Sequence, residues 1–65
     1  MNIFLNGELK STQSQNLLEL IQELSLENKR FAVEMNEIII AKSKLAQTTF
    51  SESDRIEIIH AVGGG

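Results

Sequence analysis

The sequence predicts a single α+β domain, and three observations lead to this prediction. Short apolar or alternating runs, separated by turn residues, indicate strands on both sides of one helical segment. The helical segment is about ten residues long, which is too short for a stable helix in water, so it must pack on a sheet. The most strand-like segment, 55–62, comes last and runs directly into three glycines. We therefore expect one domain over residues 1–62 and a flexible glycine tail over 63–65.

The first two strands are expected to form a hairpin. Residues 1–5 make a short apolar run, and residues 8–12 make the returning strand. Asn6-Gly7 lies between them, and Asn-Gly between two strands is the strongest short signal for a tight hairpin turn. The chain should therefore reverse at this dipeptide.

A helix is expected over residues 15–24, with Ser14 as its N-cap. Apolar residues at i, i+3, i+4 and i+7 form one stripe along this segment, while its other side is polar. In a domain this small, such a stripe is far more often core than a partner-binding face. The stripe consists of Leu17, Leu20, Ile21 and Leu24.

The second half of the chain is expected to add three strands. Residues 31–35 alternate in hydrophobicity, and Asn36-Glu37 forms a turn into a short strand over 38–40. The connection that follows has no strand pattern and only local helical character. Leu45 and Phe50 lie within it, and we expect them to plug the core.

This order of elements predicts a β-grasp, or ubiquitin-like, arrangement. In that arrangement the last strand lies centrally and parallel to the first, within a mixed sheet of about four to five strands. One main helix covers one face of the sheet. A ferredoxin-like split βαβ fold would need a second full helix. The segment around Lys42 is too short and too polar to supply it.

The open face of the sheet is a candidate docking surface. Glu57 is costly to bury, so its face of the last strand is expected to be the open one. Ile59 and Ala61 share that face, and Phe4 of the first strand is expected to lie beside Ile59. An exposed apolar patch of Phe4, Ile59 and Ala61 next to the tail would suit a protein partner.

Composition excludes several classes of function. The net charge is −3, and no basic cluster, tyrosine or tryptophan is present, which argues against nucleic acid as a partner. Cysteine is absent and no second strong ligand stands near His60, so no metal site is expected and His60 is structural or solvated. No apolar run approaches a membrane span and no signal peptide is visible, so we expect a cytoplasmic protein. No catalytic motif is found.

The tail itself offers chemistry through its terminal carboxylate. Glycine has no Cβ, so a narrow channel can enclose the backbone closely. Three extended glycines span about 10 Å, enough to reach from a docked domain into a partner's site. Chain ends are also commonly frayed. The tail alone leaves a reactive end and an inert end equally open.

The residues resemble the ThiS family of sulfur carriers in thiamin biosynthesis. The resemblance covers essentially the whole chain and rests on three segments, FAVEMNEIII, AQTT and DRIEIIHAVGGG. The last segment, in which a turn leads through a strand into the glycines, is the most specific. Ala41 departs from the pattern, because members often have proline there. This affects the stiffness of the loop and not the chemistry of the tail.

The resemblance implies a carrier that partner enzymes act on, with no bound cofactor of its own. An E1-like adenylating enzyme of the ThiF type would use ATP and Mg²⁺ to adenylate the Gly65 carboxylate. A persulfide from a cysteine desulfurase or sulfurtransferase would displace AMP and leave a thiocarboxylate. Thiazole synthase of the ThiG type would accept the sulfur. Gly63 and Gly64 would thread the tail into the partner's site.

Three other functions remain open at this point. The small subunit of molybdopterin synthase would share the fold and the thiocarboxylate, although this chain looks too short for it. A ubiquitin-like modifier would join Gly65 to a lysine of another protein. A plain β-grasp interaction module would carry an inert tail.

Overall fold

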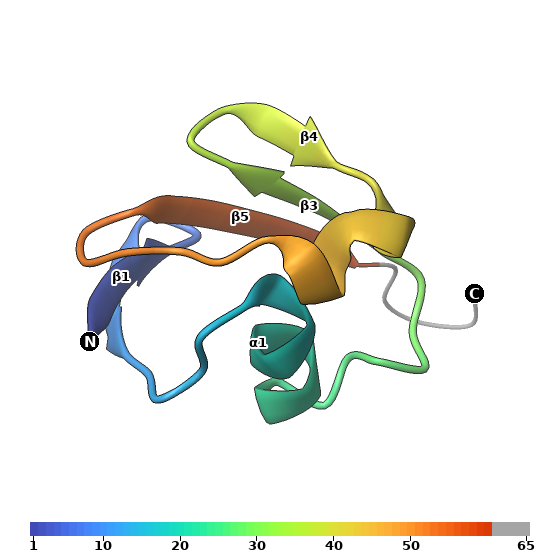
Figure 1. The fold of residues 1–65 in the computed structure, drawn as a ribbon, viewed down its shortest axis with the longest axis horizontal. Coiled ribbons are helices and arrows are strands. Elements are labelled where there is room, and N and C mark those ends of the chain that lie inside the picture. The colour runs from blue at the N-terminus through green and yellow to red at the C-terminus, as the bar shows by residue number, and fades with distance from the viewer. Residues whose placement is uncertain (61–65) are drawn as a thin grey trace.

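The computed structural model describes residues 1–60, and these form a five-stranded sheet with one α-helix and one 3₁₀ helix (Figure 1). The predicted order of elements is confirmed, whereas the predicted boundary between domain and tail lies outside the described residues. The elements are β1 (Asn2–Leu5), β2 (Glu8–Ser11), α1 (Leu17–Glu23), β3 (Phe31–Met35), β4 (Ile38–Ile40), the 3₁₀ helix η1 (Lys42–Gln47) and β5 (Arg55–His60).

The strands form one sheet in the order β2-β1-β5-β3-β4. The β1 and β5 strands run parallel, and the other neighbouring pairs run antiparallel. The last strand is therefore central, and α1 lies against one face of the sheet (Figure 1). This is the predicted β-grasp topology. It places the strand that precedes the tail in the middle of the sheet.

Both hairpins turn through two residues with positive φ. Asn6 and Gly7 have φ of 51° and 83°, as the Asn-Gly signal predicts for a type I′ turn. Asn36 and Glu37 have φ of 51° and 73° and turn β3 into β4. Glutamate pays a steric penalty of roughly 1–2 kcal/mol in the left-handed region, which glycine avoids. The second turn is therefore strained at Glu37.

The predicted N-cap was wrong. Helix α1 spans Leu17–Glu23 and is capped by Asn16, whose Oδ1 accepts a hydrogen bond of 2.9 Å from the Glu19 N–H. Ser14 is engaged elsewhere, because its hydroxyl donates to Glu23 Oε1 at 2.7 Å. Both residue types cap helices well, so this tertiary contact decides between them.

The core lies between α1 and the covered face of the sheet. The predicted stripe is buried except at Leu24, which is only partly buried. Leu45 and Phe50 from the long connection plug the core as predicted, with 4% and 6% of their surfaces exposed. The buried set is Ile3, Leu17, Leu20, Ile21, Val33, Leu45, Phe50, Ile56 and Ile58.

A polar network fastens the region after β2 to the end of α1. The Glu23 carboxylate accepts hydrogen bonds from the hydroxyls of Thr12 and Ser14, and Lys10 Nζ lies 3.1 Å from Glu23 Oε2. These hydroxyl hydrogen bonds, Thr12 first, lower the pKa of Glu23 from 4.5 to about 2, and Lys10 adds to the effect. The charged form of Glu23 therefore stabilises the fold.

Candidate functional site

The described part of the predicted site ends at His60, the last residue of β5. The predicted sulfur-bearing Gly65, the threading residues Gly63 and Gly64, and the docking residue Ala61 lie outside the described residues. What the structure does describe is the strand that leads to them and the open face of the sheet around it. By open face we mean the face turned away from α1.

The Asn6 side chain extends the pairing of β5 beyond the end of β1. The β1 strand pairs with only the first two residues of β5, Arg55 and Ile56. Past that point, the Ile58 N–H donates to Asn6 Oδ1 at 2.8 Å, and Asn6 Nδ2 donates to the Ile58 carbonyl oxygen at 3.3 Å. On its other edge β5 pairs with β3 as far as His60. The strand is therefore held from both sides up to Ile58.

The two faces of β5 alternate as the sequence predicts. Ile56 and Ile58 are buried, whereas Glu57 is exposed and Ile59 exposes 69% of its surface. His60 is also exposed and lies opposite Phe31 of β3. The open face is therefore the face that carries Glu57 and Ile59.

The predicted position of Phe4 beside Ile59 was wrong. Phe4 lies opposite Arg55, whereas Ile59 lies opposite Ala32. The four positions between Arg55 and Ile59 correspond to about 13 Å along the strand. The cause is the parallel register, because β1 reaches only the beginning of β5. The predicted patch is therefore divided into an end with Phe4 and Leu9, and an end with Ile59 and Ala32.

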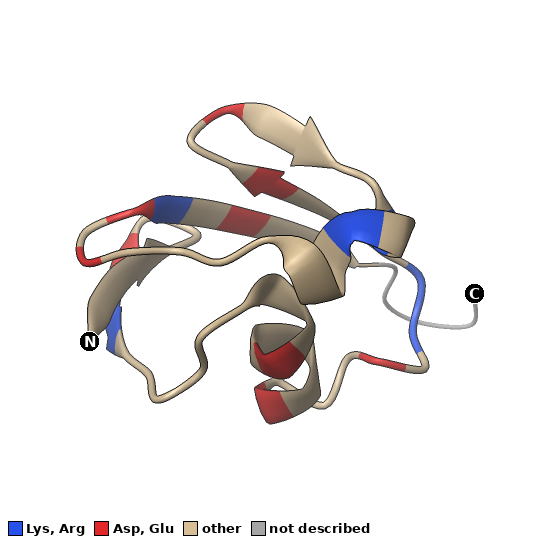
Figure 2. Cartoon of the chain, viewed as in Figure 1, with Lys and Arg blue, Asp and Glu red and all other residues tan. Residues whose placement is uncertain are grey.

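Acidic residues occupy the space between these two apolar ends. Glu57 of β5 lies directly opposite Glu34 of β3, and Ile39 of β4 lies opposite Glu34 on its other side. Opposed residues of antiparallel strands share a face, so this row also belongs to the open face. Figure 2 shows acidic positions on β3 and β5 and at the β3–β4 turn. Ile39 exposes 75% of its surface and Leu9 65%.

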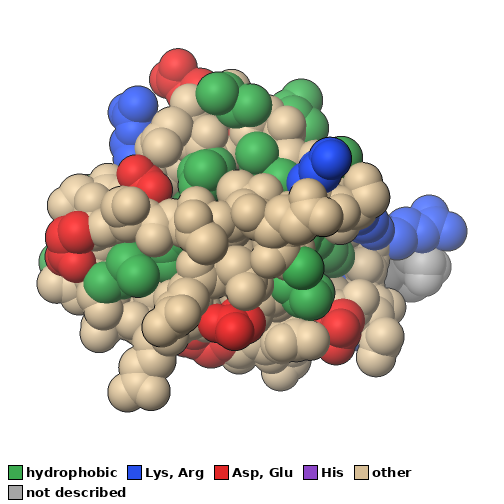
Figure 3. Space-filling view, viewed as in Figure 1, with side chains coloured by type: hydrophobic (Ala, Val, Ile, Leu, Met, Phe, Trp, Pro, Cys, Tyr) green, Lys and Arg blue, Asp and Glu red, His purple; other side chains and the backbone are tan. Residues whose placement is uncertain are grey.

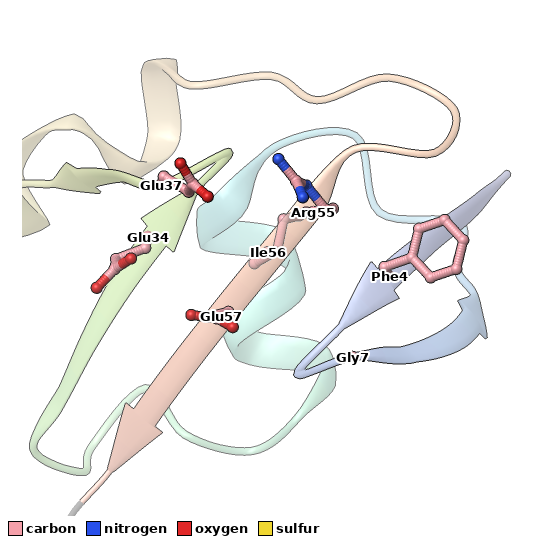
Figure 4. Close-up of a pocket in the computed structure, with 7 residues that line it drawn as sticks. All are labelled: Phe4, Gly7, Glu34, Glu37, Arg55, Ile56 and Glu57. Carbon is pink, nitrogen blue, oxygen red and sulfur yellow. The ribbon is translucent and has the colours of Figure 1, made fainter.

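A hollow of about 380 Å³ lies on the open face, and we call it the acidic hollow. Figure 4 views it with α1 behind the sheet and shows Arg55 between Phe4 and Glu37. Among residues 1–60 the one ion pair joins Lys10 to Glu23, so none joins Arg55 to the acidic residues around it. The hollow is lined by Phe4, Gly7, Glu34, Glu37, Arg55, Ile56 and Glu57.

Sequence reasoning identified neither the acidic hollow nor the two hydrogen bonds between the Asn6 side chain and the Ile58 backbone, which we call the Asn6 clamp. The opposition of Glu34 and Glu57 depends on the register between β3 and β5, which no local pattern encodes.

The side of the molecule seen in Figure 3 intersperses acidic, basic and hydrophobic side chains. In the described part of the chain, no group of three or more His, Asp or Glu residues could hold a metal ion. Within the same residues, no helix is long and apolar enough to cross a membrane.

Comparison with known proteins decides the family. The ThiS family model matches residues 3–65, nearly the whole chain. The chain belongs to the ThiS family. A solved structure agrees with this assignment: the thiamine biosynthesis protein ThiS from Geobacter metallireducens superimposes with a TM-score of 0.82 at 26% identity, over the full length of both chains. The β-grasp topology of this ThiS-family chain is thus that of a known member.

Two curated relatives bear on function. The sulfur carrier protein ThiS of Bacillus subtilis is 43% identical over 47 residues, covering 72% of this ThiS-family chain and 71% of that protein. A thiazole synthase of Paramagnetospirillum magneticum is 35% identical over 66 residues. That match includes all of this chain and 20% of the relative. The chain therefore spans about a fifth of the length of the thiazole synthases that it matches.

Proposed function

We propose that this chain is a sulfur carrier for thiamin biosynthesis and that the carboxyl group of Gly65 carries the sulfur. The observation behind the proposal is a ThiS-family β-grasp domain whose central strand leads into Gly63-Gly64-Gly65. The similarity to a sulfur carrier protein supports it. Such a carrier needs no catalytic side chain of its own, which agrees with the lack of catalytic motifs in the sequence.

Activation of the carboxylate is the first chemical step of the proposal. A carboxylate is a poor acyl donor, because oxide is a poor leaving group. A carboxylate oxygen of Gly65 attacks the α-phosphorus of ATP, pyrophosphate leaves, and an acyl-adenylate forms. An E1-like adenylating enzyme of the ThiF type supplies the site, and Mg²⁺ neutralises the phosphate charge there.

Sulfur transfer is the second step. The terminal sulfur of a persulfide on a cysteine desulfurase or sulfurtransferase attacks the acyl carbon, and AMP leaves. A thiol then cleaves the sulfur–sulfur bond of the acyl disulfide, which releases the thiocarboxylate and forms a new disulfide. Glycine at position 65 leaves the acyl carbon unhindered on its α-carbon side, which favours attack by sulfur.

The described residues support the remaining requirements of a carrier. The tail must start from a fixed point, and β5 is held on both sides up to Ile58. The domain must also dock, and the open face exposes Phe4 and Ile59. We assign docking to this face, with Ala61 as a further candidate. The thiocarboxylate would then deliver its sulfur to a ThiG-type thiazole synthase. The similarity of this chain to part of two thiazole synthases supports that choice of partner. We place these reactions in the cytoplasm.

Reconstitution tests the proposal. The full chain is incubated with its adenylating enzyme, ATP, Mg²⁺ and a persulfide donor, and its intact mass is measured. We expect a gain equal to the exchange of one oxygen for sulfur, localised to Gly65 by fragmentation. An unchanged mass beside an enzyme that turns over another carrier would contradict the proposal. Covalent adducts with other proteins would instead indicate a ubiquitin-like modifier.

A further inference from the structure

The acidic hollow combines placements that are unfavourable for the isolated domain. Glu34 and Glu57 lie directly opposite each other, and opposed like charges destabilise a sheet. Glu37, at the rim of the same hollow, has a φ of 73° where glycine is preferred. Departures from local rules of this kind tend to occur at functional sites. The acidic residues are therefore better explained by what binds them than by stability.

The chemistry of the hollow favours a cation with a flat, forked head. Three carboxylates and one guanidinium line it, so its net charge is negative. Phe4 lies at the other end of the hollow from Glu34 and Glu57, beyond Arg55, and exposes 38% of its surface, so it is available for apolar contact with a partner. A guanidinium presents a rigid fork of donors that can pair with two carboxylates at once. An ammonium group can also contact two carboxylates, but it lacks this fixed planar fork.

The surroundings of the hollow indicate that the cation belongs to a protein. Leu9, Ile39 and Ile59 are each at least 65% exposed and surround the acidic row on the open face. Free arginine would leave these side chains in water, whereas a protein surface would cover them. Aromatic and arginine anchors with apolar neighbours are typical of interface hot spots.

We propose that the open face docks a partner protein that inserts an arginine into the acidic hollow, between Glu34 and Glu57. The inference rests on the proposed function and takes the adenylating enzyme as the partner. Arg55 repels a cation placed over it and so directs the arginine towards the Glu34–Glu57 side of the hollow. Apolar side chains of the partner cover Ile59 and Ile39.

The test neutralises the two opposed carboxylates without changing their size. The Glu34→Gln, Glu57→Gln variant is compared with Glu8→Gln, Glu27→Gln, which loses the same charge away from the open face. Calorimetry measures binding of each full-length variant to the adenylating enzyme at low and high salt. We expect the first variant to bind at least about tenfold more weakly with a flatter salt dependence, and the control to change by less than about twofold.

Thermal unfolding separates a binding role from a structural one. Removing the opposed charges should raise the melting temperature of the Glu34→Gln, Glu57→Gln variant by about 2–4 °C while binding weakens. Equal binding by this variant and its control, with wild type converted to thiocarboxylate, would overturn the inference alone. Failure of the wild type to bind or be converted would overturn the proposed function as well.

Discussion

The two faces of one central strand follow different rules. In β5, Ile56 and Ile58 point to the helix and are buried, while Glu57 and Ile59 point the other way and are exposed. On the covered face, Ile56 lies opposite Leu5 and Met35, and Ile58 lies opposite Val33, as stability requires. The open face leaves large apolar side chains in water and sets Glu57 against Glu34. The difference indicates that stability has shaped one face and binding the other.

The largest contrast is expected between two isoleucines three positions apart. Ile56→Ala opens a cavity at a fully buried site and should cost roughly 2–5 kcal/mol. The free energy of unfolding of a domain this small is of similar size, so much of the variant should be unfolded at room temperature. Ile59→Asp should change the free energy of unfolding by less than about 1 kcal/mol, because its side chain is exposed. Denaturant titration followed by circular dichroism measures both.

For a variant that stays folded, Ile59 should matter for binding rather than for stability. Ile59→Asp should weaken docking to the adenylating enzyme, because it places a charge in the apolar part of the interface. A folded Ile59→Asp variant that docks like wild type would remove Ile59 from the docking surface. Unfolding of that variant would mean that the open face contributes to the core.

The Asn6 clamp holds β5, the strand that carries both faces. Its loss should have the next largest effect on the free energy of unfolding. Asn6→Ala removes both hydrogen bonds to Ile58 and puts alanine at a φ of 51°, for a combined cost of about 2–3 kcal/mol. Asn6→Gly is the matched control, because it keeps the turn and removes only the clamp, at about 1 kcal/mol. Chemical denaturation gives both values. An Asn6→Gly variant as stable as wild type would show that the clamp contributes nothing.

A smaller effect is expected from pH on the covered side. The folded pKa of Glu23, about 2, lies below its ordinary 4.5. Its contribution is therefore present above pH 4.5 and is lost as pH falls towards 2. Because the carboxylate is about a third exposed, we expect about 1 kcal/mol. Glu23→Gln should flatten this part of the stability profile. An unchanged profile would show that Thr12 and Ser14 do not favour the charged carboxylate.

Local patterns were enough to predict most of the fold. The Asn6-Gly7 turn, the alternation in β3 and β5, and the core roles of Leu45 and Phe50 follow from turn chemistry and periodicity. The N-cap did not, because Ser14 and Asn16 are equally good caps locally. Asn16 forms an isolated bridge with Thr49 while Ser14 binds Glu23, and both partners are distant in sequence.

The candidate site was less predictable for the same reason. The side to which Phe4 and Ile59 point depends on alternation alone and was predicted correctly. Their separation depends on how β1 is registered against β5, which alternation does not encode. The opposition of Glu34 and Glu57 likewise appears only when β3 and β5 are paired. Functions of the open face therefore became visible only in the folded chain.

The most direct test of the account is the mass of the protein isolated from its own cells, grown so that thiamin must be made. Fragmentation of the intact chain would locate any change. The account predicts a fraction with one oxygen replaced by sulfur at the carboxyl group of Gly65, and none in a strain without the adenylating enzyme. A chain that stays unmodified while those cells make thiamin, or that carries sulfur elsewhere, would contradict it.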